Sequence, residues 1–240
     1  MFSLIFQVFQ VMLEFPTIQI GGLTIHEPMT AFTDVILTII SFVLVGRIRN
    51  RLHESFYNNA WRLFFLFMGL STGLGVLTHG LVSLFSAWEH YLLWMAMNVA
   101  ASISVYFALQ ATIRYSRVSI RNRRLLKRIN LSVLVFFLGL TFWQNNFEIF
   151  KIHAATGVLI IFLTYFTAWT RNLVGSGAIV LAFLLSIATV FVHSFQLSIN
   201  EWFNYKDLSH VMMMVSLLLV YHGMQLSSRD LKLNWRRAIR

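Results

Sequence analysis

The sequence predicts an all-α membrane protein built as a bundle of seven transmembrane helices. Of its 240 residues, 58% are hydrophobic and only 12% are charged, and the mean hydropathy is +0.69. A soluble domain of this length carries roughly twice that charged fraction. Apolar runs of about 20 residues, the length that crosses a bilayer, recur along the whole chain. We therefore expect one membrane domain over residues 1–240 and no separate soluble domain.

Seven apolar segments are long enough to be these spans. The fourth is the least regular, because Gln144, Asn145 and Asn146 interrupt it, and an extension to Phe150 is an alternative. The N-terminus is apolar but lacks a basic start and a small-residue cleavage site, so we expect residues 1–26 to be an extracytoplasmic interfacial segment, not a signal peptide. The expected spans are 28–45, 61–83, 91–113, 130–143, 152–169, 176–195 and 207–226.

Basic residues predict the orientation of the bundle. With seven spans, 17 of the 19 basic residues fall on one side, and only Lys151 and Lys206 fall on the other. The positive-inside rule makes the basic side cytoplasmic, so the N-terminus is expected outside and residues 227–240 form a basic cytoplasmic tail. The net charge of +10 is thus explained by topology and contact with anionic lipid, and we expect no nucleic-acid binding. The 17 residues are Arg47, Arg49, Arg51, Arg62, Arg114, Arg117, Arg121, Arg123, Arg124, Lys127, Arg128, Arg171, Arg229, Lys232, Arg236, Arg237 and Arg240.

The chain contains no cysteine, which excludes several kinds of chemistry. Disulfides, cysteine-ligated zinc, thiol nucleophiles and iron–sulfur clusters all require this residue. Because the chain is compact and has short loops, we expect a bacterial inner-membrane protein.

Ionisable side chains gather at the expected outer ends of the spans. An ionisable group in hydrocarbon is costly, so it usually faces a partner inside the bundle and serves a function. Neutral imidazole binds zinc, copper and iron, so the group predicts a buried metal or proton site, although a single interfacial histidine is more often a structural hydrogen-bonding residue. The group comprises His26, His79, His90, His153, His193 and His210, with Glu27, Asp34, Glu89 and Asp207.

Four members of this group are the candidate metal ligands. Asp207 and His210 are three residues apart at the start of the seventh span, so they share one helical face. His79 and His90 flank a short outer turn that brings them near each other. A catalytic zinc ion takes three protein ligands and leaves one position open, and a carboxylate can be a ligand or can orient a ligand histidine.

The first span carries polar residues on one face. Glu27, Thr30 and Asp34 are spaced by three and four residues. Pro28 suits a first helical turn, and Glu27 suits the positive end of the helix dipole, so a helix cap also explains Glu27. Asp34 lies about two turns into the membrane, where a bare carboxylate costs a few kcal/mol, and it should face a histidine or a threonine hydroxyl. With Glu89, Asp34 is a candidate general base.

These features together resemble the CREST superfamily of seven-transmembrane proteins, which includes the alkaline ceramidases and the progestin and adipoQ receptors. The resemblance implies a zinc ion held by three histidines near one membrane face, and a lipid amide as the substrate of ceramidase-like members. The residues that carry it are Glu27, Thr30, Thr33 and Asp34 at the first helix, His79 late in the second, His90 opening the third and His210 early in the seventh.

Two positions depart from the family pattern. Gly75 stands where the family has a serine, four residues before His79. Lys206 stands where the family has the first histidine of a His-x-x-x-His motif, and only His210 remains. Asp207, with a one-residue shift, or His90 could supply the missing ligand. An altered or inactive site follows from these departures as naturally as a working one.

Several functions stay open. The first is a zinc-dependent hydrolase of a lipid amide or ester, with zinc on His79, His210 and either Asp207 or His90, one of the two candidate acids as base, and a substrate that enters laterally from the membrane. The second is a non-catalytic receptor-like or complex-subunit protein that uses the basic tail and loops as a surface for a protein partner. A haem-binding electron-transfer protein is a third. A proton-coupled transporter lacks the broken pair of spans expected of that class.

Overall fold

The computed structural model describes residues 15–52, 55–116, 118–144 and 146–238. Seven helices in these ranges are long and apolar enough to cross a membrane. The predicted all-α bundle is therefore confirmed, and the protein is an integral membrane protein with seven candidate spans. The helices are α2 (Pro28–Leu52), α3 (Phe56–Gly75), α4 (Ala87–Tyr115), α5 (Ile120–Gln144), α6 (Phe147–Trp169), α7 (Ser176–Ser194) and α8 (Tyr205–Ala238).

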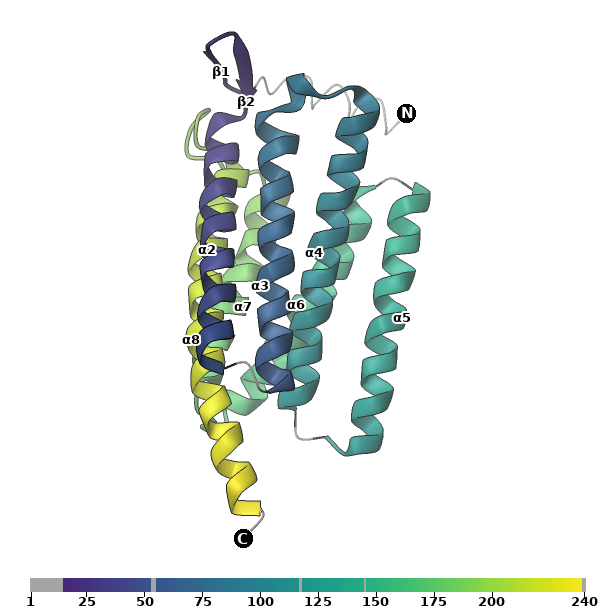
Figure 1. Ribbon diagram of the computed structural model, residues 1–240, viewed down its shortest axis with the longest axis vertical. Helices are drawn as coiled ribbons and strands as arrows, with labels where there is room; N and C mark the ends of the chain where they lie inside the picture. Colours follow the sequence, from purple (N-terminus) through teal and green to yellow (C-terminus); the bar gives the residue numbers. More distant parts are fainter. Residues whose placement is uncertain (1–14, 53–54, 117, 145, 239–240) are drawn as a thin grey trace.

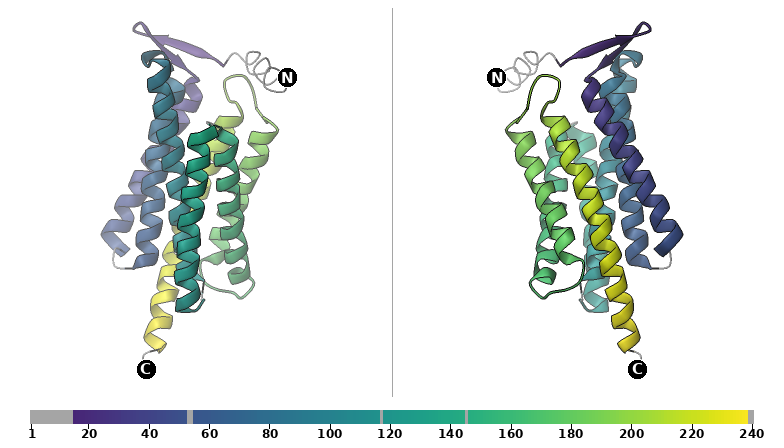
Figure 2. Two further views of the ribbon diagram at one scale, coloured as in Figure 1. Left: turned by 90° about the vertical axis from the view of Figure 1, so that its right-hand side faces the viewer. Right: turned by 90° about the vertical axis from the view of Figure 1, so that its left-hand side faces the viewer.

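Six of these helices form a closed ring, and α5 lies outside it. Around the ring α2 packs on α3, α3 on α4, α4 on α6, α6 on α7, α7 on α8, and α8 on α2. Helix α5 packs mainly along α4 and α6 and stands at one edge of the bundle (Figure 1). The chain thus returns to its starting point, and the first and last helices lie side by side (Figure 2).

A short antiparallel hairpin covers one end of the bundle. Its strands are β1 (Thr17–Ile20) and β2 (Leu23–His26), joined through Gly21 and Gly22, which both have positive φ. Only glycine adopts that backbone region readily, which explains the tight turn. The hairpin occupies the later part of the expected interfacial segment 1–26. The earlier part, residues 1–13, lies outside the described residues. We refer to this end as the hairpin end; the last turns of α8 lie at the opposite end (Figure 1).

Local capping sets where several helices begin. Ser55 caps α3 by accepting a hydrogen bond from the Asn58 amide. Ser86 and Glu89 form a reciprocal capping box at the start of α4. Each cap satisfies amides that the first helical turn leaves without a partner. Helices α3 and α4 therefore begin at Phe56 and Ala87, a few residues before the expected spans 61–83 and 91–113.

The structure corrects two expected boundaries. Helix α5 ends at Gln144, and Asn146 caps α6 by accepting from the Glu148 amide, so the alternative extension of the fourth span to Phe150 is wrong. The polar residues that interrupt the pattern separate two helices instead. Helix α8 continues through Ala238, so the helix that forms the seventh span extends beyond the expected end at Leu226 and includes residues 227–238 of the expected basic tail.

The second span ends in irregular helix. After Gly75, α3 passes into a π-helical turn, η1 (Val76–Gly80), and then into a short 3-10 turn, η2 (Val82–Leu84). A π-turn widens the helix by one residue, and such turns are frequent at functional sites. His79 lies on η1, so its side chain extends from a widened π-helical turn and not from a regular α-helical turn.

The interior of the ring is packed with large side chains. Trp61, Phe65 and Tyr165 are completely buried. The Tyr57 and Tyr165 hydroxyls lie 3.0 Å apart, and the Tyr115 and Tyr165 rings stack with centroids 4.5 Å apart. These contacts join α3, α4 and α6. By contrast, most of α5 is exposed, as expected for a helix that faces lipid on several sides.

Candidate functional site

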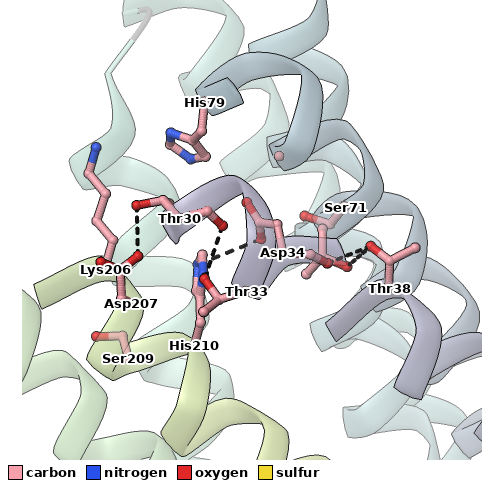
Figure 3. A network of polar contacts seen from close by, with 12 residues as sticks. Thr30, Thr33, Asp34, Thr38, Ser71, His79, Lys206, Asp207, Ser209 and His210 are labelled. Atoms are coloured by element: carbon pink, nitrogen blue, oxygen red, sulfur yellow. Dashed lines mark hydrogen bonds and ion pairs between the residues drawn. The ribbon is translucent and has the colours of Figure 1, made fainter. Parts of the chain in front are cut away.

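A network of polar side chains joins α2 to α8 near the hairpin end (Figure 3). The predicted polar face of α2 supplies one half of it, and the start of α8 supplies the other. We call this network the polar cluster. It consists of Glu27, Thr30, Thr33, Asp34, His79, Lys206, Asp207 and His210.

His210 lies between two neighbouring residues of α2. Its Nδ1 is 2.8 Å from the Thr33 hydroxyl, and its Nε2 is 3.6 Å from Oδ1 of Asp34. Thr33 and Asp34 are both buried. The expectation that Asp34 faces the interior and meets a histidine or a threonine is therefore met by His210, and both nitrogens of the imidazole face α2 (Figure 3).

Asp207 is held by one group on α2 and one on its own helix. The Thr30 hydroxyl donates to Oδ1 at 2.8 Å, and the Asn204 amide donates to Oδ2 at 2.7 Å. The second bond is a helix cap, because Asn204 directly precedes α8. Both carboxylate oxygens of Asp207, which is buried, thus accept hydrogen bonds from the protein.

Glu27 connects three segments that are distant in the sequence. It has a positive φ of 42° at the junction between β2 and α2, and its amide donates to the Pro16 carbonyl. Its carboxylate accepts from Lys206 Nζ at 2.9 and 2.7 Å, and Oε2 is also 3.6 Å from His79 Nδ1. The contact to the lysine goes beyond a helix cap and ties α2 to α8.

Gly75, where the resemblance to the CREST superfamily implies a serine, lies against the Asp34 carboxyl group. A Cβ atom added at Gly75 would lie 2.5 Å from Oδ2 of Asp34 and 2.9 Å from its Cγ. The Asp34 carboxyl group therefore occupies the space that a serine side chain would need. Gly75 and Asp34 are complementary, and a serine at 75 is incompatible with this position of Asp34.

The other predicted site residues lie apart from the polar cluster. His90 Nε2 is 3.2 Å from the Thr78 carbonyl, so the turn does bring it beside the segment that carries His79. Glu89 is exposed, and its carboxylate accepts from the amide and the hydroxyl of Ser86 at 2.8 Å. Within the described residues, the Glu89 carboxylate contacts Ser86 and not the polar cluster. Its role as a general base stays a prediction.

The remaining outer histidines are also separate. His153 is buried against Phe137, with ring centroids 5.2 Å apart, and neither of its nitrogens has a hydrogen-bond partner among the residues that the structure describes. His193 packs edge-on against Tyr205. His26 pairs with Thr17 in the hairpin. Within the part of the chain that the structure describes, His79 and His210 are the two of these six histidines that contact acids of the cluster.

In this arrangement the cluster does not fit a zinc ion. Among the residues that the structure describes, no three histidine or acidic side chains are placed to hold a metal together. The donor atoms have protein neighbours instead: those of His210 face Thr33 and Asp34, and those of Asp207 accept two hydrogen bonds. Zinc thus stays a prediction from the sequence.

An apolar groove of about 490 Å³ lies beside the cluster. Pro28 and Gly80, which line it, directly follow Glu27 and His79. The lining comes from the hairpin, α2, η1 and the loop before α8. Its side chains include Ile18, Ile25, Phe32, Val35, Val76 and Trp202.

A family model described as a family of unknown function (DUF6962) matches residues 29–228. The chain belongs to this family. Comparison with curated proteins and with solved structures found no match. The range matched by the DUF6962 model includes every cluster residue from Thr30 to His210, and Glu27 lies two residues before it.

In this DUF6962 protein, the partnership of Glu27 with Lys206 was not foreseen. The sequence did contain a signal for it. Lys206 is one of only two basic residues on the expected outer side, and Glu27 is an acid at the same end of another span. Opposite charges near hydrocarbon at the same depth are expected to pair.

Proposed function

We propose that this DUF6962 protein is a non-catalytic, receptor-like membrane protein that binds a membrane lipid at the hairpin end. The polar head of the lipid would contact the polar cluster, and an acyl chain would lie in the adjacent groove. The observation that carries the proposal is this adjacency: the groove and the cluster share the first turns of α2 and the π-turn η1.

The composition of the groove favours an acyl chain. The side chains that line it are hydrocarbon or aromatic, and Phe32 and Trp202 are more than half exposed. Ligand sites typically combine such an apolar lining with a few polar groups that fix orientation. Here Glu27 and His79 would provide the polar groups. A lipid could enter laterally, as expected from the sequence. The resemblance to the CREST receptors also supports this function.

Photocrosslinking tests this proposal. The protein would be placed in nanodiscs that contain a phospholipid with a diazirine on its acyl chain, and crosslinked residues would be mapped by mass spectrometry. We expect crosslinks on the groove residues of α2 and η1. Val35→Trp fills the groove and should lower this labelling about tenfold, in keeping with a loss of roughly 1.4 kcal/mol of binding.

A matched control is available on α5. Val135 is 62% exposed and does not line the groove, so Val135→Trp should leave the crosslinks on α2 and η1 unchanged. If Val35→Trp labels as strongly as the wild type while its fold is intact, the lipid does not occupy the groove and the proposal fails.

A metal-dependent lipid hydrolase is the second candidate. It is favoured by the gathering of Asp34, His79, Asp207 and His210 within one cluster, and zinc binding would require these side chains to move away from their present protein partners. This candidate requires about one zinc ion per wild-type chain and a lower content in His79→Ala and His210→Ala. Metal analysis of the purified proteins therefore separates it from the receptor-like function.

A further inference from the structure

Lys206 is enclosed by groups that bind cations. Its Nζ lies 2.9 and 2.7 Å from the two carboxylate oxygens of Glu27 and 4.4 Å from the centroid of the Phe15 ring. The side chains of Lys206 and Glu27 are only 17% and 15% exposed. A carboxylate on one side and an aromatic face on the other stabilise an ammonium with little help from water.

The ammonium lies among the residues from which a metal site would be assembled. Glu27 Oε2, which accepts from Lys206, is also 3.6 Å from His79 Nδ1. Lys206 and His210 are four residues apart on α8 and thus share one helical face. Figure 3 shows Lys206 beside Asp207, on the same side of the cluster as His79.

We propose that Lys206 is the resident cation of the polar cluster, and that its ammonium keeps a divalent metal away from the Glu27 carboxylate and the neighbouring His79. This inference concerns the site of the proposed function, but it rests on the contacts of Lys206. It is tested with zinc and without lipid, so the two proposals can fail separately.

Charge balance gives the physical reason. The cluster contains three carboxyl groups, on Glu27, Asp34 and Asp207, in a place with little access to water. Such a set needs a positive charge nearby, and a lysine that belongs to the chain supplies it permanently. A dication beside the same carboxylate would be repelled by the ammonium. Removal of the ammonium would leave a site that is short of one cation.

Substitution of Lys206 by histidine tests the proposal. Lys206→His removes the ammonium and places two imidazoles four residues apart on α8, a spacing that suits one zinc ion. Zinc would be titrated into purified protein and followed by calorimetry and by metal content after desalting. We expect Lys206→His to retain about one zinc and to bind it at least about 30-fold more tightly than the wild type does. This factor corresponds to the loss of the repulsion between a dication and an ammonium ~4 Å apart in a water-like dielectric.

Two variants serve as controls. Lys206→Arg keeps the positive charge and should remain as low in zinc as the wild type. Lys151→His introduces a histidine at the same end of the bundle, but on α6, where Lys151 pairs with Glu148. It should not gain zinc either. If wild type or Lys206→Arg binds zinc as tightly as Lys206→His, or if folded Lys206→His binds none, Lys206 is not what excludes the metal.

A stability cycle covers the case in which Lys206→His does not fold. Thermal unfolding would be compared for Glu27→Gln, Lys206→Met and the double variant. A resident cation predicts that each single change lowers the melting temperature, and that the double variant recovers part of the loss because it leaves no unpaired charge. Additive losses in the double variant would overturn the proposal.

Discussion

At the scale of single residues, the main feature is the match between Asp34 and Gly75. A carboxyl group two turns inside a membrane helix needs room and a partner. His210 provides the partner, and the missing side chain at Gly75 provides the room. Within the described part of the chain, Oδ2 of Asp34 has no hydrogen-bond partner, so the position of this oxygen depends on packing more than on hydrogen bonding. The sequence singled out both Asp34 and Gly75. It did not show that the Asp34 carboxyl group fills the space left by the missing side chain at Gly75.

Gly75→Ala should destabilise the protein by about 1–3 kcal/mol, because the added methyl group overlaps the buried Asp34 carboxyl group. Thermal unfolding in a single detergent measures this. The matched control is Gly73→Ala on the same helix, where an added Cβ would lie 3.6 Å from Thr38 Cγ2, an ordinary contact. Equal melting temperatures for the two variants would contradict the packing described for Asp34.

At the scale of elements, the contact between α7 and α8 depends on two glycines. Gly175 has a φ of 83° and directly precedes α7, and Gly223 faces it from α8. A Cβ added at Gly223 would lie 2.7 Å from the Gly175 carbonyl oxygen and 2.6 Å from Ile179 Cγ1. Small residues at such contacts allow membrane helices to approach closely. The Ser227 hydroxyl also donates to the Val174 carbonyl across this contact.

We expect Gly223→Ala to separate α7 from α8 and to cost about 1–3 kcal/mol of unfolding free energy. Gly139→Ala is the control, because nothing lies within 4 Å of its added Cβ on α5. It should be neutral or should stabilise the protein by up to about 1 kcal/mol, since alanine favours helix over glycine. Chemical or thermal unfolding would measure both. A wild-type melting temperature for Gly223→Ala would show that this contact is not close.

At the scale of the whole molecule, charge is distributed unevenly between the two ends. Among the described residues, nearly all basic ones lie in the loops and helix ends away from the hairpin, while Lys206 and Lys151 lie toward the hairpin end. The positive-inside rule then predicts that the hairpin end faces away from the cytoplasm. The polar cluster and the groove would be reached from that side or from the outer leaflet.

Single cysteines would test this orientation without background, because the natural chain has none. Glu201→Cys lies in the exposed loop between α7 and α8, and Ser119→Cys lies just before α5. In intact cells a membrane-impermeant maleimide should label Glu201→Cys, and it should label Ser119→Cys only after permeabilisation. The reverse pattern would contradict the predicted orientation.

The number of spans and the polar face of α2 could be predicted because both are local properties. A span is recognised from about 20 consecutive apolar residues, and a helical face follows from spacings of three and four. The helix ends were less predictable: Asn146 interrupts an apolar pattern, but it does so as the cap of α6. The gathering of His79, Asp34, Asp207 and His210 at one end was also foreseen, because topology fixes the depth of each residue.

The sequence by itself therefore determined that the protein has seven membrane helices and that several ionisable side chains lie at one end of them. Only the tertiary structure decided which of these side chains meet. It placed α2 beside α8, α5 outside the ring, and Lys206 on Glu27, a residue 179 positions away. The reason is that periodicity specifies which face of a helix is polar, whereas the neighbour of that face depends on how all the helices pack together.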